Sequence, residues 1–207
     1  MSSLDAWFDP PIVAILRGVK PEEVEAVGEA LVEAGIRVLE VPLNSPKPLE
    51  SIGRLASTLL GRALVGAGTL RRPAEVNDVA RAGGRLIVTP HADASIVREA
   101  KGLGLFAVPG VATPTEAFAM LDAGADALKL FPAEMLGPPV VKALAAVLPA
   151  GTKLLPVGGI TPEAMAAFRA AGAAGFGLGS ALYRPGAPPG QVRDRARAFL
   201  AAWRDVA

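Results

Sequence analysis

Short apolar runs rich in β-branched residues recur along the chain, and each is followed by a segment with helical spacing. The runs span residues 12–16, 38–43, 64–67, 86–89, 106–108, 127–131, 154–157 and 176–178. Landmark residues at their carboxyl ends recur roughly every 23 residues. Strands that are apolar nearly throughout, each followed by a helix, are typical of a parallel sheet whose outer face is covered.

Eight regular βα units predict an α/β chain that closes into a single (β/α)8 TIM barrel. An open doubly wound sheet is the alternative, and the barrel is favoured because no break in composition marks a switch point. We expect one domain over residues 1–207, an N-terminal capping helix at residues 4–8 across the barrel floor, and a last helix at residues 188–207.

Helix boundaries are marked by proline or threonine at the start and by Ala-Gly at the end. A helix is predicted to begin at Pro21 and to close at Ala34-Gly35. Thr113 fits a capping box for a helix that closes at Ala123-Gly124. Another helix is expected to start at Thr161 and to end at Ala171-Gly172.

Charge and residue usage exclude several classes of function. A net charge of +1 and an aromatic content of 5% leave neither a basic field nor stacking surfaces for nucleic acid. No apolar run reaches the roughly 18 residues of a membrane span, and the acidic, proline-containing start is unlike a signal peptide, so we expect a cytoplasmic protein with no membrane partner. With no cysteine and only His91, the chain lacks the side chains for disulfides, zinc ribbons and Ser-His-Asp triads, and no metal site is expected.

Three ionisable residues stand where a parallel barrel carries its functional groups, in or directly after apolar strands. Glu40 lies within V-L-E-V-P-L, Lys129 within A-L-K-L-F-P, and Arg17 ends I-V-A-I-L-R. Strand alternation turns the neighbours of Glu40 and Lys129 toward the helices if both charges face the interior. A desolvated lysine has a lowered pKa and supplies the neutral amine that forms a Schiff base with a ketone, and Glu40 is the matching general acid/base. The alternative is a buried Lys129 to Glu40 ion pair without chemistry.

Glycine clusters follow the seventh and eighth expected strands, the usual phosphate position in barrels. One is Val157-Gly158-Gly159, and the other contains Gly179-Ser180. Backbone amides at such bends bind anions, so we expect a phosphate there. Thr69 ends the third expected strand, where its hydroxyl either faces the site or caps the next helix, and His91 is interpreted as a surface group.

These segments together resemble the KDPG/KHG aldolases, which are class I enzymes that cleave 2-keto-3-deoxy-6-phosphogluconate, its galactonate epimer or 4-hydroxy-2-oxoglutarate. The resemblance runs from about residue 11 to 186 and is carried by L-R-G (16–18), V-L-E-V-P-L-N-S (38–45), V-G-A-G-T (65–69), P-G-V-A-T-P-T-E (109–116), L-K-L-F-P-A (128–133), V-G-G-I (157–160) and G-L-G-S-A-L-Y (177–183). It implies a Schiff-base lysine at Lys129, a general acid/base at Glu40, and a grip on the pyruvate carboxylate by Arg17 with Thr69.

The resemblance further implies a substrate phosphate on the loops of the last two strands, a homotrimer, and a small anionic keto-acid as the partner of the site. The phosphate groups implied are the amides of Gly158, Gly159 and Gly179 and the hydroxyl of Ser180. No cofactor is expected, because the covalent Schiff base with Lys129 serves as the electron sink.

Two positions depart from the phosphogluconate enzymes. Those enzymes usually carry an arginine where this chain has Asn44, and Thr-Gly-Gly where it has Val157-Gly158-Gly159. These spellings look more like the phosphogalactonate branch, and the epimer stays open. A metal-assisted sugar-phosphate epimerase or isomerase, and a non-catalytic sugar-phosphate-binding barrel, are the competing interpretations.

Overall fold

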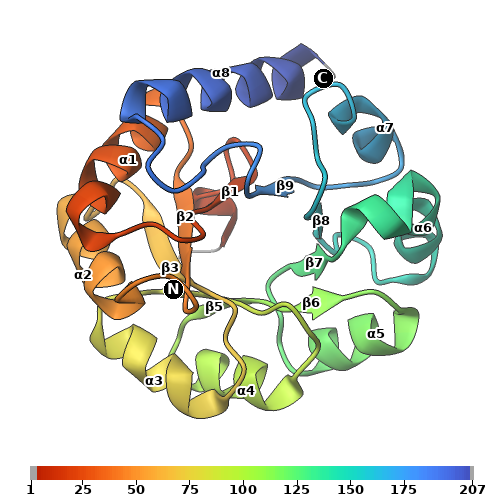
Figure 1. Cartoon of the computed structure of the whole chain (residues 1–207). Coiled ribbons are helices and arrows are strands. Elements are labelled where there is room, and N and C mark those ends of the chain that lie inside the picture. The colour runs from red at the N-terminus through yellow and green to blue at the C-terminus, as the bar shows by residue number, and fades with distance from the viewer. Residues whose placement is uncertain (1–3, 206–207) are drawn as a thin grey trace.

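The computed structural model describes residues 4–205 and consists of short parallel strands inside a ring of helices (Figure 1). The strands are β1 (Ile12–Ile15), β2 (Val38–Pro42), β3 (Leu64–Gly68), β4 (Leu86–Val88), β5 (Phe106–Val108), β6 (Gly110–Val111), β7 (Leu128–Leu130), β8 (Leu154–Pro156) and β9 (Phe176–Leu178). The helices are α1 (Pro21–Ala34), α2 (Pro48–Thr58), α3 (Pro73–Arg81), α4 (Ala94–Gly102), α5 (Pro114–Asp122), α6 (Ala133–Val147), α7 (Met165–Ala170) and α8 (Pro189–Asp205). Every strand expected from the sequence is present, and each expected βα unit has its helix.

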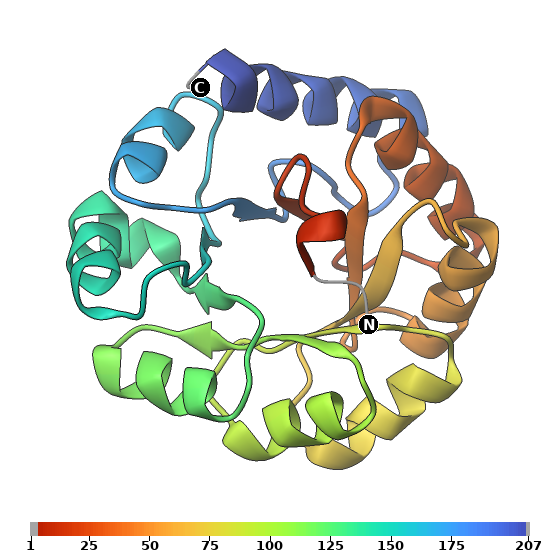
Figure 2. The same cartoon turned by 180° about the vertical axis from the view of Figure 1, so that it is seen from behind.

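The hydrogen-bonded strands form two sheets, so the expected closed eight-stranded TIM barrel is wrong. One sheet is a curled half-barrel of six parallel strands in the order β5-β4-β3-β2-β1-β9, and the other has the order β6-β7-β8. The open doubly wound sheet is not found either, since the helices lie on the outer side of the strands (Figures 1 and 2).

Prolines explain the two seams between the sheets. The fifth expected strand, residues 106–108, is present as β5, and Pro109, which has no N–H to donate to a neighbouring strand, separates it from β6, a short strand that the sequence did not predict. The next amide, Gly110 N–H, donates to the Thr89 hydroxyl at 3.3 Å instead of to a backbone carbonyl. At the other seam β8 ends at Pro156. Ala174 N–H, just before β9, donates to Leu154 O at 2.9 Å, and an isolated bridge pairs Val157 with Gly177.

Helix boundaries follow the local signals closely, with one exception. Helix α1 begins at Pro21 and is capped by Gly35 at a φ of 112°, and Thr113 forms the expected capping box with Glu116 at the start of α5. Helix α7 begins at Met165, later than expected, because a turn follows Thr161 before the helix starts. Helix α8 ends at Asp205, and the last two residues of its expected range lie outside the described residues.

Two apolar cores lie on opposite faces of the strands. The larger one packs strand side chains against the helices, and the smaller fills the interior with Val13, Val38, Val88 and Val108 among others. A 3-10 helix at Leu4–Ala6, shorter than the expected 4–8, covers the interior at the end seen in Figure 2, and Leu4 is 3% exposed there. None of the helices described between residues 4 and 205 has the length and hydropathy that a membrane crossing requires.

Strand parity places the two buried charges on the interior side. Residues Leu39 and Val41 flank Glu40, Leu128 and Leu130 flank Lys129, and all four apolar neighbours belong to the outer core under the helices. Because side chains alternate along a strand, Glu40 and Lys129 turn toward the interior. This confirms the orientation expected from the sequence for both residues.

Candidate active site

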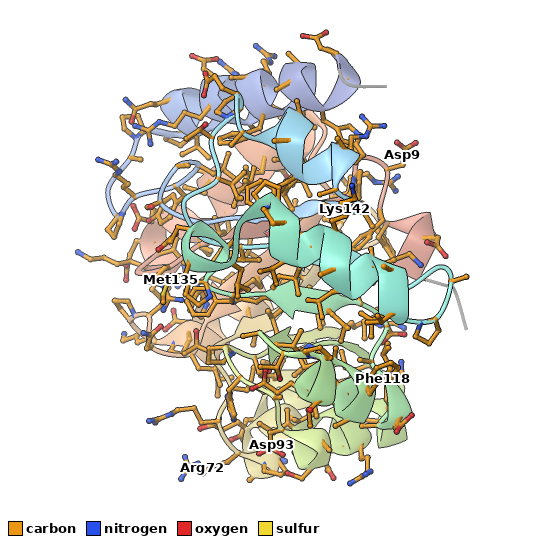
Figure 3. The ribbon with its side chains drawn as sticks, turned by 90° about the vertical axis from the view of Figure 1, so that its right-hand side faces the viewer. Asp9, Arg72, Asp93, Phe118, Met135 and Lys142 are labelled. Carbon is orange, nitrogen blue, oxygen red and sulfur yellow. The ribbon has the colours of Figure 1, made fainter. Side chains whose placement is uncertain are left out.

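The carboxyl ends of the strands meet at one end of the molecule. Figure 3 shows Arg72 and Asp93, the residues that precede α3 and α4, at the same end as Met135 in the first turns of α6, with Asp9 toward the other end. Helices begin where the preceding strands end, so this end carries the strand-to-helix loops. In folds of this kind, it is the end where functional side chains gather.

A cavity of about 160 Å³ opens at this end, over the seam between β8 and β9. It brings together most of the residues that the sequence singled out, namely Arg17, Lys129, Gly158, Gly159, Gly179 and Ser180. Glu40 and Thr69 do not line this cavity, but each lies next to a residue that does. Glu40 shares a deeper cavity with Lys129, and Thr69 contacts Arg17.

Glu40 is the most enclosed of these groups, with a side chain 1% exposed on β2. Its Oε2 atom is buried and has no hydrogen-bond partner within the described chain. Burial raises the pKa of Glu40 to about 7, and the positive charges of Lys129 and Arg17 oppose that rise without cancelling it. A carboxyl group with a pKa near neutrality can both accept and return a proton at physiological pH.

The Glu40 carboxylate rests against the backbone of β3, where only a glycine leaves room. A Cβ added at Gly68 would overlap both oxygens of Glu40. A second cavity of about 10 Å³, the room of roughly one water molecule, has Glu40 and Lys129 in its lining. The two groups therefore face a common space inside the strands.

Lys129 is 5% exposed on β7, and its ammonium lies 4.8 Å from the centre of the Phe131 ring. Burial lowers the pKa of Lys129, the charge of Glu40 acts in the opposite direction, and Arg17 lowers it further. Among residues 4–205 no ion pair within 4.0 Å involves Lys129 or Glu40, so the two charges do not form a direct ion pair.

Arg17 follows β1, and its guanidinium is held between the loops after β2 and β3. Its Nη1 donates to Asn44 Oδ1 at 2.7 Å, and its Nη2 donates to Thr69 Oγ1 at 3.4 Å. Thr69 has a left-handed φ of 63° and does not cap α3, whose N-cap is Arg72. The structure thus excludes the capping alternative for Thr69, whose hydroxyl contacts the guanidinium of Arg17.

The glycine loops present unused backbone donors to the cavity. Gly158 and Gly159 have φ values of 109° and 65°, and a Cβ on either would lie within 2.8 Å of Glu134 Oε2. Within residues 4–205 none of the amides of Gly159, Gly179 and Ser180 donates to a backbone carbonyl. Several free N–H groups converging on one cavity are suited to an anion.

His91 is exposed and lines neither cavity. In the part of the chain that the structure describes, no group of three or more histidine, cysteine, aspartate or glutamate side chains is arranged to hold a metal ion.

Three contributors to the site were not assigned a role from the sequence. Phe131 shares a strand face with Lys129, and the two-residue spacing could have shown this. Gly68 touches Glu40 across β2 and β3, and Asn44 contacts Arg17 between two loops. No local pattern reveals such contacts, because they depend on how neighbouring strands are staggered.

Comparison with known proteins shows which family the chain resembles. The family model described as KDPG and KHG aldolase matches residues 7–187. A probable 2-dehydro-3-deoxy-6-phosphogalactonate aldolase of Rhizobium meliloti (strain 1021) is 47% identical over 95% of this chain and 92% of its own length. A solved structure described as native KDPGal superimposes with a TM-score of 0.93 at 46% identity, covering 95% of both chains. A KDPG aldolase from Legionella pneumophila, solved with pyruvate captured as a covalent carbinolamine intermediate, gives a TM-score of 0.82 at 28% identity over 91% of this chain and 93% of that one.

Proposed function

The chain belongs to the KDPG and KHG aldolase family, and from that premise we propose that it cleaves a 2-keto-3-deoxy-6-phospho-sugar acid through a Schiff base on Lys129. The products are pyruvate and glyceraldehyde 3-phosphate. The observation that carries this proposal is a buried lysine of lowered pKa at the floor of an open cavity, facing a buried carboxyl group across a shared space.

Lys129 acts as the nucleophile. Its neutral amine attacks the ketone carbon C2, water leaves, and an iminium ion forms. The iminium accepts the electron pair of the C3–C4 bond when that bond breaks, which gives an enamine and an aldehyde. Protonation of the enamine carbon and hydrolysis then release pyruvate and return the free amine, and no metal or organic cofactor takes part.

Glu40 moves the protons, directly or through one water molecule. It removes the proton of the C4 hydroxyl as the C3–C4 bond breaks, and then returns a proton to the enamine. A pKa of about 7 supports both steps, because each form of the carboxyl group is populated near neutral pH. The small cavity between Glu40 and Lys129 has room for the relaying water.

Arg17 and the glycine loops bind the two ends of the substrate. The guanidinium of Arg17, beside Thr69, pairs with the carboxylate next to the ketone. The phosphate lies on the free amides of the glycine loops, with Ser180 donating its hydroxyl. All of these groups except Thr69 border the cavity that contains Lys129.

The galactonate epimer is the substrate that we propose. The relative at 47% identity bears the name of a phosphogalactonate aldolase, and Val157 lines the cavity without a hydroxyl for the substrate C4 hydroxyl. Side-by-side kcat/KM values for 2-keto-3-deoxy-6-phosphogalactonate, its gluconate epimer and 4-hydroxy-2-oxoglutarate test this choice. A preference for the gluconate epimer would refute it without affecting the lysine chemistry.

Borohydride reduction in the presence of pyruvate tests the Schiff base. We expect the mass of one reduced pyruvyl group on Lys129, located by peptide mass spectrometry. Lys129→Met is expected to take no label and to lose turnover by several orders of magnitude. Lys142→Met, on the outer helix α6, is the control and should keep both full labelling and full turnover. An unlabelled protein, or a label on another lysine, would contradict the mechanism.

We further propose that residues 1–207 act as one aldolase domain and that the chain assembles as a homotrimer, as the family resemblance implies. Light scattering coupled to size-exclusion chromatography measures the assembly. A mass of one chain, 21.1 kDa, would rule the trimer out.

A further inference from the structure

The side chain of Arg17 is held at both arms by loops that follow two different strands. Asn44, after β2, accepts from Nη1 at 2.7 Å, and Thr69, after β3, accepts from Nη2 at 3.4 Å. Arg17 itself is an exposed residue, so without these contacts its long side chain would sample many rotamers in water. The shorter and stronger of the two contacts is the one to Asn44.

The residue after Asn44 fixes the backbone of the same loop. Ser45 is 6% exposed, and its hydroxyl accepts from Gly18 N–H at 2.9 Å. Gly18 has a left-handed φ of 80°, so the chain turns sharply directly after Arg17. Two adjacent side chains of the β2–α2 loop thus hold the β1–α1 loop. Ser45 binds the backbone of Gly18, and Asn44 binds the guanidinium of Arg17.

These contacts leave Arg17 with donors to spare. A guanidinium has five N–H groups, and Asn44 and Thr69 engage one on each arm. Arg17 also lines the cavity that contains Lys129. A carboxylate in this cavity therefore meets an arginine already set in one orientation, with less side-chain entropy to lose on binding.

We propose that Asn44 is a positioning residue, which orients the Arg17 guanidinium for the carboxylate of the keto-acid through the Asn44 Oδ1 hydrogen bond. This inference rests on the proposed function, because it assigns the carboxylate of that substrate to Arg17. Asn44 acts through Arg17 and takes no part in bond breaking.

A double-mutant cycle tests the role, with the pyruvate concentration for half-maximal borohydride trapping at Lys129 as the measurement. Asn44→Ala is expected to raise this concentration on the order of tenfold. In an Arg17→Ala background the same change is expected to have no further effect, and Arg17→Lys provides a second background that retains the charge but cannot reach both partners. Asn77→Ala is the matched control, since Asn77 donates to Glu99 at 2.8 Å between the outer helices α3 and α4, and it should leave trapping unchanged.

The outcomes separate the two proposals. If Asn44→Ala leaves the pyruvate dependence unchanged, or weakens trapping equally in the presence and absence of Arg17, the positioning role is refuted while the aldolase mechanism stands. If the unsubstituted chain takes no label at Lys129, the proposed function fails and this inference fails with it. Thermal unfolding of each variant, expected to match that of the parent chain, shows that loss of trapping does not reflect loss of fold.

Discussion

Glu40→Gln replaces a buried acid by a neutral amide of the same shape, so its effect on stability depends on pH. In the unfolded chain the glutamate titrates near 4.5, whereas burial raises the folded-state pKa to about 7. Between these values the folded chain holds a proton that the unfolded chain has released, and the folded state loses stability as the pH rises. The shift from 4.5 to about 7 corresponds to about 3 kcal/mol of lost stability above pH 7.

The amide variant carries no such penalty at any pH. We expect it to exceed the parent chain by no more than about 1 kcal/mol at pH 5, where the loss has only begun, and by up to about 3 kcal/mol at pH 8. Urea unfolding at the two pH values measures the difference. Turnover should fall by about 10² to 10⁴-fold in the same variant, because the amide cannot accept a proton.

The pH dependence of kcat/KM gives an independent reading of the same group. The ionised fraction of an acid with a pKa of about 7 rises from about one tenth at pH 6 to about nine tenths at pH 8, so the parent enzyme should show a rising limb that the variant lacks.

Glu116→Gln is the control of opposite sign for the stability measurement, because backbone amides at the start of α5 lower the pKa of Glu116. That variant should be less stable than the parent chain at pH 8, and the difference should shrink as the pH falls from 4.5 through the lowered folded-state pKa of Glu116. A Glu40→Gln offset that is equal at pH 5 and pH 8, or a variant less stable at pH 8, would refute the reasoning.

Two further substitutions test the packing around the site and the seam. Gly68→Ala places a methyl group into the Glu40 carboxylate, and we expect kcat to fall at least tenfold, with a loss of stability of about 1–3 kcal/mol from overpacking, measured by steady-state kinetics and urea unfolding. The carboxylate of Asp126 accepts from the Lys101 ammonium at 2.7 Å and from the Ala107 amide at 2.8 Å. Asp126→Ala removes this acceptor, and we expect the free energy of unfolding to fall by about 1–3 kcal/mol with kcat/KM unchanged.

Matched variants control for the chemistry of each change. Gly53→Ala adds the same methyl group in α2, where the nearest atom, Ala82 O, would be 3.6 Å away, and it should leave kcat unchanged. Asp122→Ala removes an aspartate from the end of α5 and should change stability by less than about 0.5 kcal/mol. A Gly68→Ala enzyme with normal kcat would show that Glu40 tolerates displacement, and an unchanged unfolding free energy for Asp126→Ala would show that its contacts contribute nothing net.

Local signals in the sequence predicted most of the fold, because they act within one turn or one strand. Pro21 and Gly35 bound α1, and Thr113 caps α5, as their backbone preferences require. Closure of the sheet was predicted wrongly, because regular spacing counts strands but does not report which of them pair. At Pro109 the absence of an N–H separates β5 from β6, a short strand that belongs to the other sheet and that the sequence did not predict.

Some residues of the candidate site could likewise be predicted from the sequence, and others could not. Lys129 and Glu40 could be found from the sequence because an ionisable residue inside an apolar strand is costly and therefore conspicuous. The contact of Asn44 with Arg17 could not, because it joins loops that are separate in sequence and meet through the register of β1 on β2.

The seam between β8 and β9 has a consequence for the chemistry of binding. A fully paired parallel sheet consumes its backbone N–H groups in strand-to-strand bonds and offers few to a ligand. Here regular pairing ends at the isolated bridge of Val157 with Gly177, and among residues 4–205 the amides of Gly159, Gly179 and Ser180 beyond it donate to no backbone carbonyl. In the proposed phosphate site, an incoming anion would therefore complete hydrogen bonding that the strands leave unfinished.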